Sequence, residues 1–226
     1  MFAESLPHPG PAIRVLSLMA RLAPPGRKVF DRSILIRRKY GRTEPVLLPE
    51  GLYSAWAGVK ETAYMDAHSE ATSSGAYSRR VSRGDLCLCL KRGEEVIGYR
   101  WAKRGSACLF CGFGPGYEIL FFPLRPDQVF VYDSYVYSAH RGHSYNTLLR
   151  RLMHQALQRE GVRESYALVA PENTTSLKLT LRTGSEPLCM AYGIRIRDWN
   201  KVILGPRPDA QLMRWIARFK RREGID

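Results

Sequence analysis

The alternation of apolar and polar residues along the chain predicts a series of strands separated by polar turns. Residues 86–102 hold two apolar runs around the turn Arg92-Gly93-Glu94, and this pattern predicts a hairpin. Residues 128–137, "QVFVYDSYVY", are rich in valine and tyrosine, which is typical of a strand. Further strands are predicted at residues 29–40, 107–114, 117–122, 164–170, 188–196 and 199–205.

Apolar residues that recur at helical spacing predict the helices. The helix that starts after residue 144 has an apolar face formed by Leu148, Leu149, Leu152, Met153, Ala156 and Leu157, and Gly161 ends it as a left-handed cap. Residues 173–184 predict a short helix closed by Gly184, and residues 52–71 also read as helical. Residues 77–85 read as a polar connection. Helices on a strand-rich scaffold predict an α/β or α+β domain with a mostly antiparallel sheet.

Breaks in this pattern divide the chain into three parts. "APPGRK" at residues 23–28 cannot continue a helix, so residues 1–28 are predicted to be an N-terminal extension with a short amphipathic helix. Residues 29–205 form the predicted main domain. Residues 206–226 are predicted to be a basic amphipathic helix, which begins at Pro208 and Asp209.

The turn "RGHSYN" at residues 141–146 lies between a strand and a helix and is the candidate functional feature. Positive charge at the start of a helix opposes the helix dipole, so Arg141 and His143 need a reason to be there. Backbone amides at a helix start have no internal partner and bind phosphate well. Gly142 permits an unusual dihedral angle, and Ser144 can cap the helix. Two readings are open at this point: a pyrophosphate cradle, or a capped helix with solvated basic residues nearby.

The composition indicates the charge of the binding partner but does not identify the partner. The chain has 226 residues, of which 35 are Lys or Arg and 21 are Asp or Glu, and its formal net charge is +14. This surplus predicts an anionic partner. The five cysteines, an odd count without a secretion signal, predict reduced thiols in the cytoplasm. Cys87 and Cys89 read as buried strand residues, and we expect no metal site. No apolar run reaches 18 residues, so we expect no transmembrane helix.

From Tyr135 to Pro187 the chain resembles the core of the GCN5-related N-acetyltransferases, the GNAT superfamily. Arg141 stands at the arginine of the family's Arg-x-x-Gly-x-Gly/Ala loop, and Gly184 stands at the glycine of its Gly-Phe pair. Asn173 and Ser176 match the family's Asn-x-x-Ser. "EEVIGYRWA" at residues 94–102 resembles an earlier strand pair, so the resemblance covers residues 80–200. The departures are Ser144 and Asn146 in place of glycines, Thr180 in place of a tyrosine and Ser185 in place of a phenylalanine.

The resemblance implies a mixed, mostly antiparallel sheet flanked by helices, with strands that splay at the cofactor site. It also implies an N-acetyltransferase that moves an acyl group from acetyl-CoA or another acyl-CoA to a primary amine. The implied cofactor-binding residues are Tyr135, Val136, Tyr137, Arg141, Gly142, His143, Ser144, Tyr145, Asn146, Asn173 and Ser176. Among the residues of the preceding strand, Asp133 is the candidate general base and Tyr137 the candidate acid. Each also has an ordinary structural reading, as a partnered carboxylate or as a packing tyrosine.

Other functions remain open in the sequence. The basic C-terminal helix suits an anionic membrane surface or an acidic acyl carrier protein, which predicts as an alternative a carrier-dependent N-acyltransferase of lipid or envelope metabolism. The same helix also fits simple docking onto the sheet. A non-catalytic acyl-CoA-binding module is the third reading. Nucleic acid is disfavoured because no binding motif is recognised. We expect a cytoplasmic protein, with peripheral attachment at the inner membrane face as an alternative.

Overall fold

The computed structural model describes residues 30–41, 45–69, 75–108, 121–196, 199–205, 208 and 210–225. The chain divides into two compact units. The central unit consists of Tyr40–Ala107 and Pro123–Ser165, and the terminal unit consists of Met1–Lys39, Cys108–Phe122 and Tyr166–Asp226. The expected extension at residues 1–28 lies outside the described residues.

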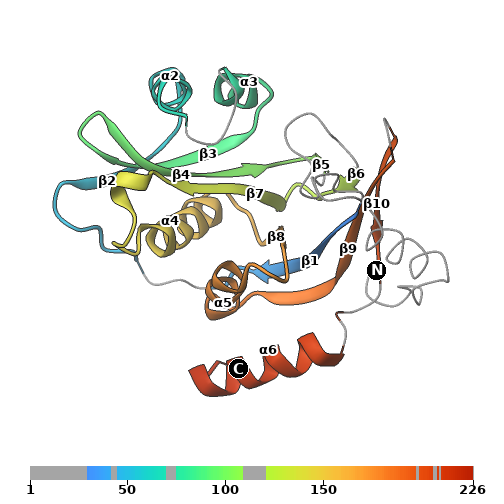
Figure 1. Cartoon of the computed structure of the whole chain (residues 1–226). Helices are drawn as coiled ribbons and strands as arrows, with labels where there is room; N and C mark the ends of the chain where they lie inside the picture. Colours follow the sequence, from blue (N-terminus) through green and yellow to red (C-terminus); the bar gives the residue numbers. More distant parts are fainter. Residues whose placement is uncertain are drawn as a thin grey trace. The chain divides into compact units, whose positions relative to one another are not determined.

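The central unit is built on an antiparallel sheet in the order β7-β4-β3-β2 (Figure 1). Its strands are β2 (Leu52–Trp56), β3 (Leu86–Arg92), β4 (Glu95–Lys103) and β7 (Gln128–Val136). The predicted hairpin is confirmed, since β3 and β4 pair from Arg92↔Glu95 to Leu86↔Ala102. Both strands are buried almost throughout, which explains their nearly continuous apolar runs.

Helices cover both faces of this sheet. Figure 1 shows α2 (Val59–Ala67) and α3 (Ala76–Ser82) on one face and α4 (Tyr145–Arg159) on the other. The predicted apolar face of α4 is confirmed in part: Leu149, Leu152, Met153 and Leu157 are buried, whereas Leu148 and Ala156 are half-buried. On the opposite face, the core joins Met65, Tyr77, Cys87, Cys89, Val96, Tyr99, Trp101 and Tyr137. Cys87 and Cys89 therefore pack as small apolar residues, and burial raises the pKa of the Cys87 thiol.

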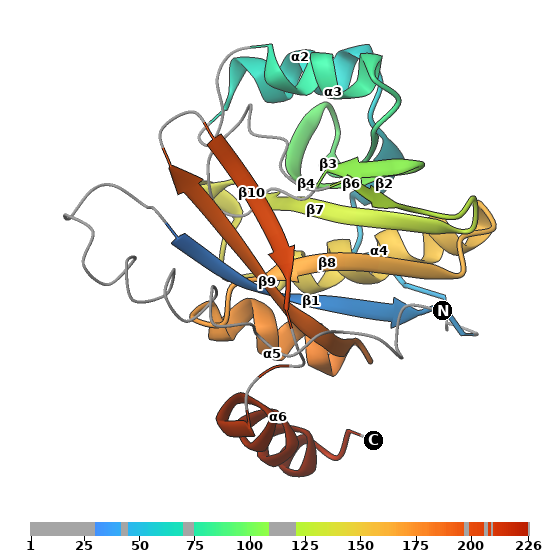
Figure 2. The same ribbon diagram turned by 90° about the vertical axis from the view of Figure 1, so that its right-hand side faces the viewer.

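The terminal unit contains a second antiparallel array, in which β9 (Glu186–Ile196) lies between β1 (Phe30–Lys39) and β10 (Trp199–Leu204) (Figure 2). The strands predicted at residues 188–196 and 199–205 are thus confirmed, and they pair as a hairpin. Two helices, α5 (Thr174–Arg182) and α6 (Ala210–Glu223), pack against this array. Their shared core contains Ile34, Ile36, Val169, Leu177, Leu181, Met190, Ile216 and Phe219. The strand β8 (Glu164–Val169) crosses the division between the units.

Three local predictions were wrong. Leu52–Trp56 is a strand, because it pairs with β3 from Leu52↔Arg92 to Trp56↔Leu88, and the helix begins only at Val59. The segment read as a polar connection contains α3, whose amides at Tyr77 and Ser78 bond the Asp66 carboxylate at 3.1 and 3.2 Å. The strands predicted at residues 107–114 and 117–122 were expected to continue the main sheet, but Ser106–Cys108 (β5) and Phe121–Pro123 (β6) form a separate two-stranded sheet. Residues 109–120 lie outside the described residues. No helix within the described residues is long and apolar enough to cross a membrane.

Candidate functional site

A β-bulge in β7 shapes the strand that precedes the candidate loop. Trp101 of β4 pairs with Asp133 and Ala102 pairs with Val131, so Tyr132 is the extra residue on β7. A bulge re-aims side chains that strict alternation would place on opposite faces. As a result, one arginine, Arg80 of α3, contacts both Tyr132 and Asp133.

The Asp133 carboxylate is held by that arginine. Arg80 Nη1 donates to Asp133 Oδ2 at 2.6 Å, and both side chains are about one-quarter exposed, at 22% and 27%. The guanidinium carbon lies 5.5, 5.2 and 5.3 Å from the ring centres of Tyr77, Trp101 and Tyr132. Burial opposes the charged form of Arg80, but the hydrogen bond and charge of Asp133 outweigh it and raise the pKa of Arg80. Asp133 Oδ1 accepts no hydrogen bond among the described residues.

Aromatic side chains continue from this ion pair toward the loop. Tyr135, near the end of β7, and Tyr137, directly after it, lie on the same side of the chain, with ring centres 5.7 Å apart and planes at 86°. Both contact Tyr99, whose hydroxyl lies 2.6 Å from that of Tyr77. Burial raises the pKa of Tyr99 well above its usual value, so this phenol stays protonated. Tyr137 is 7% exposed and is therefore a packing residue as well as a candidate acid.

The loop between β7 and α4 presents a row of backbone amides. A single 3-10 turn at Ser138–His140 follows β7, and α4 begins at Tyr145. Gly142 has φ +88° and Ser144 has φ +58°, the only positive φ of a non-glycine residue among those described. Within the described part of the chain, the amides of residues 142–146 have no backbone acceptor. Alternating left-handed residues with outward amides form an anion-binding nest at a helix N-terminus.

Ser144 occupies the N-cap position of α4, but its side chain does not cap the helix. The sequence predicted a side-chain cap, but the Ser144 side chain makes no capping hydrogen bond. A normal capping residue has extended dihedral angles, which aim its hydroxyl at the first helical amides. The left-handed conformation of Ser144 aims it elsewhere and so leaves those amides open. Strained backbone of this kind tends to occur at functional sites, which favours the cradle over the simple cap.

Arg141 lies folded back onto β7. Its guanidinium donates to the Tyr135 hydroxyl at 2.8 Å and to the Val136 carbonyl at 3.3 Å, and it lies 5.3 Å from the centre of the Tyr135 ring. The sequence reading placed Arg141 against a pyrophosphate. That contact requires the exposed guanidinium to exchange these two bonds for phosphate oxygens.

Other side chains that the sequence reading did not assign to the loop lie beside it. Arg92, at the end of β3, donates to the Tyr145 hydroxyl at 3.3 Å and adds a second guanidinium. Ser134 donates to the Asn146 side chain at 3.3 Å. Arg92 belongs to a hairpin 53 residues earlier in the sequence, so no local pattern connects it with the loop.

The remaining predicted residues belong to the terminal unit. Asn173 is the N-cap of α5, and its side chain accepts from the Ser176 amide at 3.0 Å, so this pair has a structural role of its own. Thr180 is 1% exposed and lies within the buried face of α5. A cavity of about 310 Å³ adjoins this helix. It is lined by Arg32, Pro171, Thr174, Leu177, Met190, Gln211, Leu212 and Trp215, none of which was a predicted site residue.

Gly98 lets β4 approach β7 at the end that leads into the loop. A Cβ at this position would lie 2.6 Å from the Tyr135 carbonyl oxygen and 3.2 Å from the Val136 Cα. We expect Gly98→Ala to lower the free energy of unfolding by about 1–3 kcal/mol, since the backbones must separate. Gly41→Ala is the control, because nothing lies within 4 Å of its Cβ. Denaturant unfolding measures the stability of both variants. If Gly98→Ala were as stable as Gly41→Ala, β4 and β7 would not be closely packed at Gly98.

The model of the acetyltransferase (GNAT) family matches residues 51–184, more than half of the chain. The fold class predicted from the sequence, a mostly antiparallel sheet flanked by helices, is also that of GNAT structures that match the chain. Comparison with curated proteins gave no match.

Three solved structures illustrate the similarity. A tandem GNAT protein from the clavulanic acid biosynthesis pathway is 17% identical with TM-score 0.53, over 83% of this chain and 58% of that one. A GCN5-related N-acetyltransferase from Sphaerobacter thermophilus is 15% identical with a TM-score of 0.53, and the match covers 80% of this chain and 54% of that one. The glucosamine N-acetyltransferase region of a fungal multi-domain β-N-acetylglucosaminidase is 14% identical with a TM-score of 0.58, and the match covers 84% of this chain and 23% of that one. The chain thus spans little more than half the length of the first two proteins.

Proposed function

Because the chain belongs to the acetyltransferase (GNAT) family, we propose that it transfers an acetyl or other acyl group from an acyl-CoA to a primary amine. The observation that carries the proposal is the loop between β7 and α4. There, left-handed Gly142 and Ser144 leave the amides of residues 142–146 without backbone acceptors at the start of a 15-residue helix. These amides would hold the diphosphate of CoA, with Arg141 and the nearby Arg92 supplying positive charge.

The proposed chemistry follows the face of β7. The thioester would lie beside Val136, whose peptide group would polarise its carbonyl, because the Tyr137 amide already donates to the Ile97 carbonyl at 3.0 Å. The amine nitrogen attacks the carbonyl carbon, the C–S bond breaks, and CoA leaves as a thiolate. Asp133 Oδ1 would take the proton released by the amine, directly or through water, while Arg80 orients the carboxylate through Oδ2. The Tyr137 phenol would supply a proton to the leaving thiolate.

The resemblance also assigns two residues of the terminal unit to the binding of the pantetheine arm. Asn173 and Ser176 stand at the family's Asn-x-x-Ser, and this role stays a proposal beside the α5 cap that the Asn173 oxygen makes. Thr180 is buried, and its aliphatic hydroxyl is a far weaker acid than a phenol, so it does not replace the tyrosine that serves as the acid in many relatives. The acid is therefore assigned to Tyr137, directly after β7.

Binding and turnover test the proposal separately. Acetyl-CoA at about a hundredfold excess over its Kd should raise Tm by about 5–10 °C. Acetyl-pantetheine, which lacks the diphosphate, should stabilise the protein far less. Thiol release in the presence of a panel of primary amines then measures transfer. A Tm shift without any amine-dependent thiol release would indicate a non-catalytic acyl-CoA-binding protein, and the absence of a shift would refute the proposed site.

A further inference from the structure

The C-terminal helix α6 divides its surface into a docked face and an exposed basic face. Ile216 and Phe219 are buried in the core of the terminal unit, and Leu212 and Trp215 pack against it. Contacts between α5 and α6 fix this orientation, together with a double hydrogen bond from Arg182 to Glu223 at 2.9 and 3.0 Å. The helix is therefore docked on its own unit, and Leu212, Trp215, Ile216 and Phe219 are not free to enter a bilayer.

The exposed face carries a row of arginines, here called the arginine stripe, which consists of Arg214, Arg218, Arg221 and Arg222. With 3.6 residues per turn, the stripe occupies about 100° of the helix circumference and extends for about 12 Å. The only acidic residue of the helix, Glu223, is engaged by Arg182. No carboxylate among the described residues lies within ion-pair distance of Arg214, Arg218 or Arg221.

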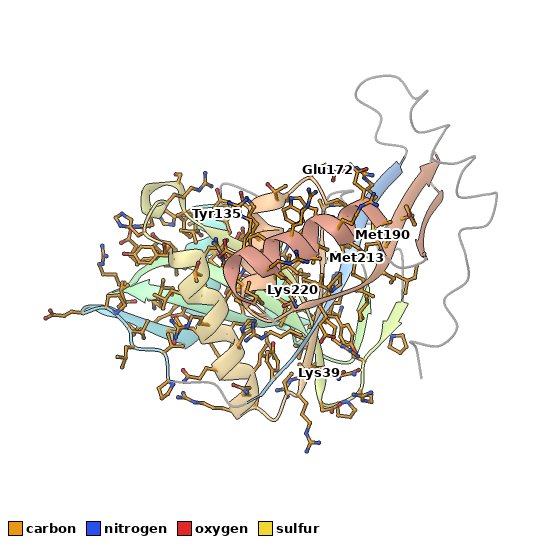
Figure 3. The ribbon with its side chains drawn as sticks, turned by 90° about the horizontal axis from the view of Figure 1, so that it is seen from below. Lys39, Tyr135, Glu172, Met190, Met213 and Lys220 are labelled. Atoms are coloured by element: carbon orange, nitrogen blue, oxygen red, sulfur yellow. The ribbon has the colours of Figure 1, made fainter. Side chains whose placement is uncertain are left out.

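A lysine of α5 adds positive charge near the arginine stripe. Lys178 of α5 is exposed beside Glu223 and contributes to lowering the pKa of that carboxyl, after the larger effect of Arg182. Met213, which is 38% exposed, is the neighbouring apolar side chain (Figure 3). The whole helix lies beyond residue 184, where the family match ends, so the family chemistry does not account for this charge.

We propose that the arginine stripe docks the protein onto an anionic phospholipid surface. Guanidinium groups bind phosphate oxygens in a bidentate manner, and a band of arginines on one side of a helix can meet a plane of phosphates. Single-stranded nucleic acid would need exposed aromatic rings for stacking, but Trp215 and Phe219 stack on each other, 5.7 Å apart, and pack against the core. Binding is therefore electrostatic, superficial and sensitive to salt.

Vesicle sedimentation of the full chain tests this proposal. The native protein should bind vesicles made of equal parts phosphatidylcholine and phosphatidylglycerol at low salt, and should not bind pure phosphatidylcholine. Changing Arg214, Arg218 and Arg221 to Glu should weaken binding by at least about 100-fold, since each basic residue near an anionic bilayer contributes about fivefold. The matched control changes Lys60, Arg83 and Arg151 to Glu; these residues are exposed in the central unit and give the same change in net charge.

The vesicle experiment includes a control for folding and has two results that would overturn docking at the arginine stripe. Circular dichroism checks that both variants remain folded, and replacing the same stripe residues with Gln provides a milder second variant. Equal losses in the stripe and control variants would show that net charge alone is responsible, and would overturn the proposal. Binding to duplex RNA or polyglutamate with no binding to vesicles would also overturn it, because the partner would then be a polymer. Acyl transfer in solution is measured independently and does not depend on this result.

Discussion

Replacing Arg141 and Ser144 together with Glu should weaken acyl-CoA binding by at least about 100-fold, because charge-assisted hydrogen bonds of about 1.5–3 kcal/mol each are lost and repulsion replaces them. The two carboxylates would stand at the amides of residues 142–146, where the diphosphate is proposed to bind. Acidic residues are compatible with the first turn of a helix, so the fold should be retained. Isothermal titration with acetyl-CoA provides the measurement.

Two further variants sharpen this prediction. Arg151→Glu changes an exposed residue of the same helix, α4, away from the loop, and should leave affinity within about twofold. Ser144→Gly keeps the left-handed backbone and removes the strain of a side chain at φ +58°, so it should retain binding. Unchanged affinity in the double glutamate variant would exclude this loop as the diphosphate site.

Asp133→Asn should lower kcat by about 100-fold or more and leave the KM for acyl-CoA nearly unchanged. General-base catalysis typically contributes about 10²–10⁴-fold, and an amide cannot accept the amine proton. Asparagine keeps the size of the side chain and an oxygen for Arg80, so the local packing is maintained. Steady-state kinetics with saturating amine, together with denaturant unfolding of both proteins, supply the measurement.

The alternative role of Asp133 leads to a different pattern. If the carboxylate only anchors Arg80 to the β7 bulge, Asp133→Asn should reduce stability while kcat remains near its original value. Asp127→Asn, just before β7, is the control, because this half-buried carboxylate pairs with the exposed Arg125 at 3.2 Å. A destabilised but fully active Asp133→Asn variant would remove this residue from the mechanism.

Local sequence patterns predicted an element correctly where the residues of that element alone determine its structure. Periodicity identified the β3–β4 hairpin, β7, α4 and α6, because a pleated strand and an amphipathic helix each impose their own spacing on apolar residues. The glycine after α4 was also identified correctly, since Gly161 has φ +78°. The same rules failed for α3, whose only buried residue is Tyr77 and whose first amides bond Asp66, 11 residues earlier.

The sequence by itself therefore determined the order of most elements, the family core and the position of the basic loop before α4. Only the tertiary structure decided that Ser144 adopts a left-handed backbone, that the bulge turns Asp133 toward Arg80, and that α6 buries its apolar face. Each of these depends on contacts between segments far apart in the chain: Arg80 and Asp133, for example, are separated by 53 residues. Periodicity and turn chemistry act over a few residues, whereas such pairings depend on strand register and on which faces meet during packing.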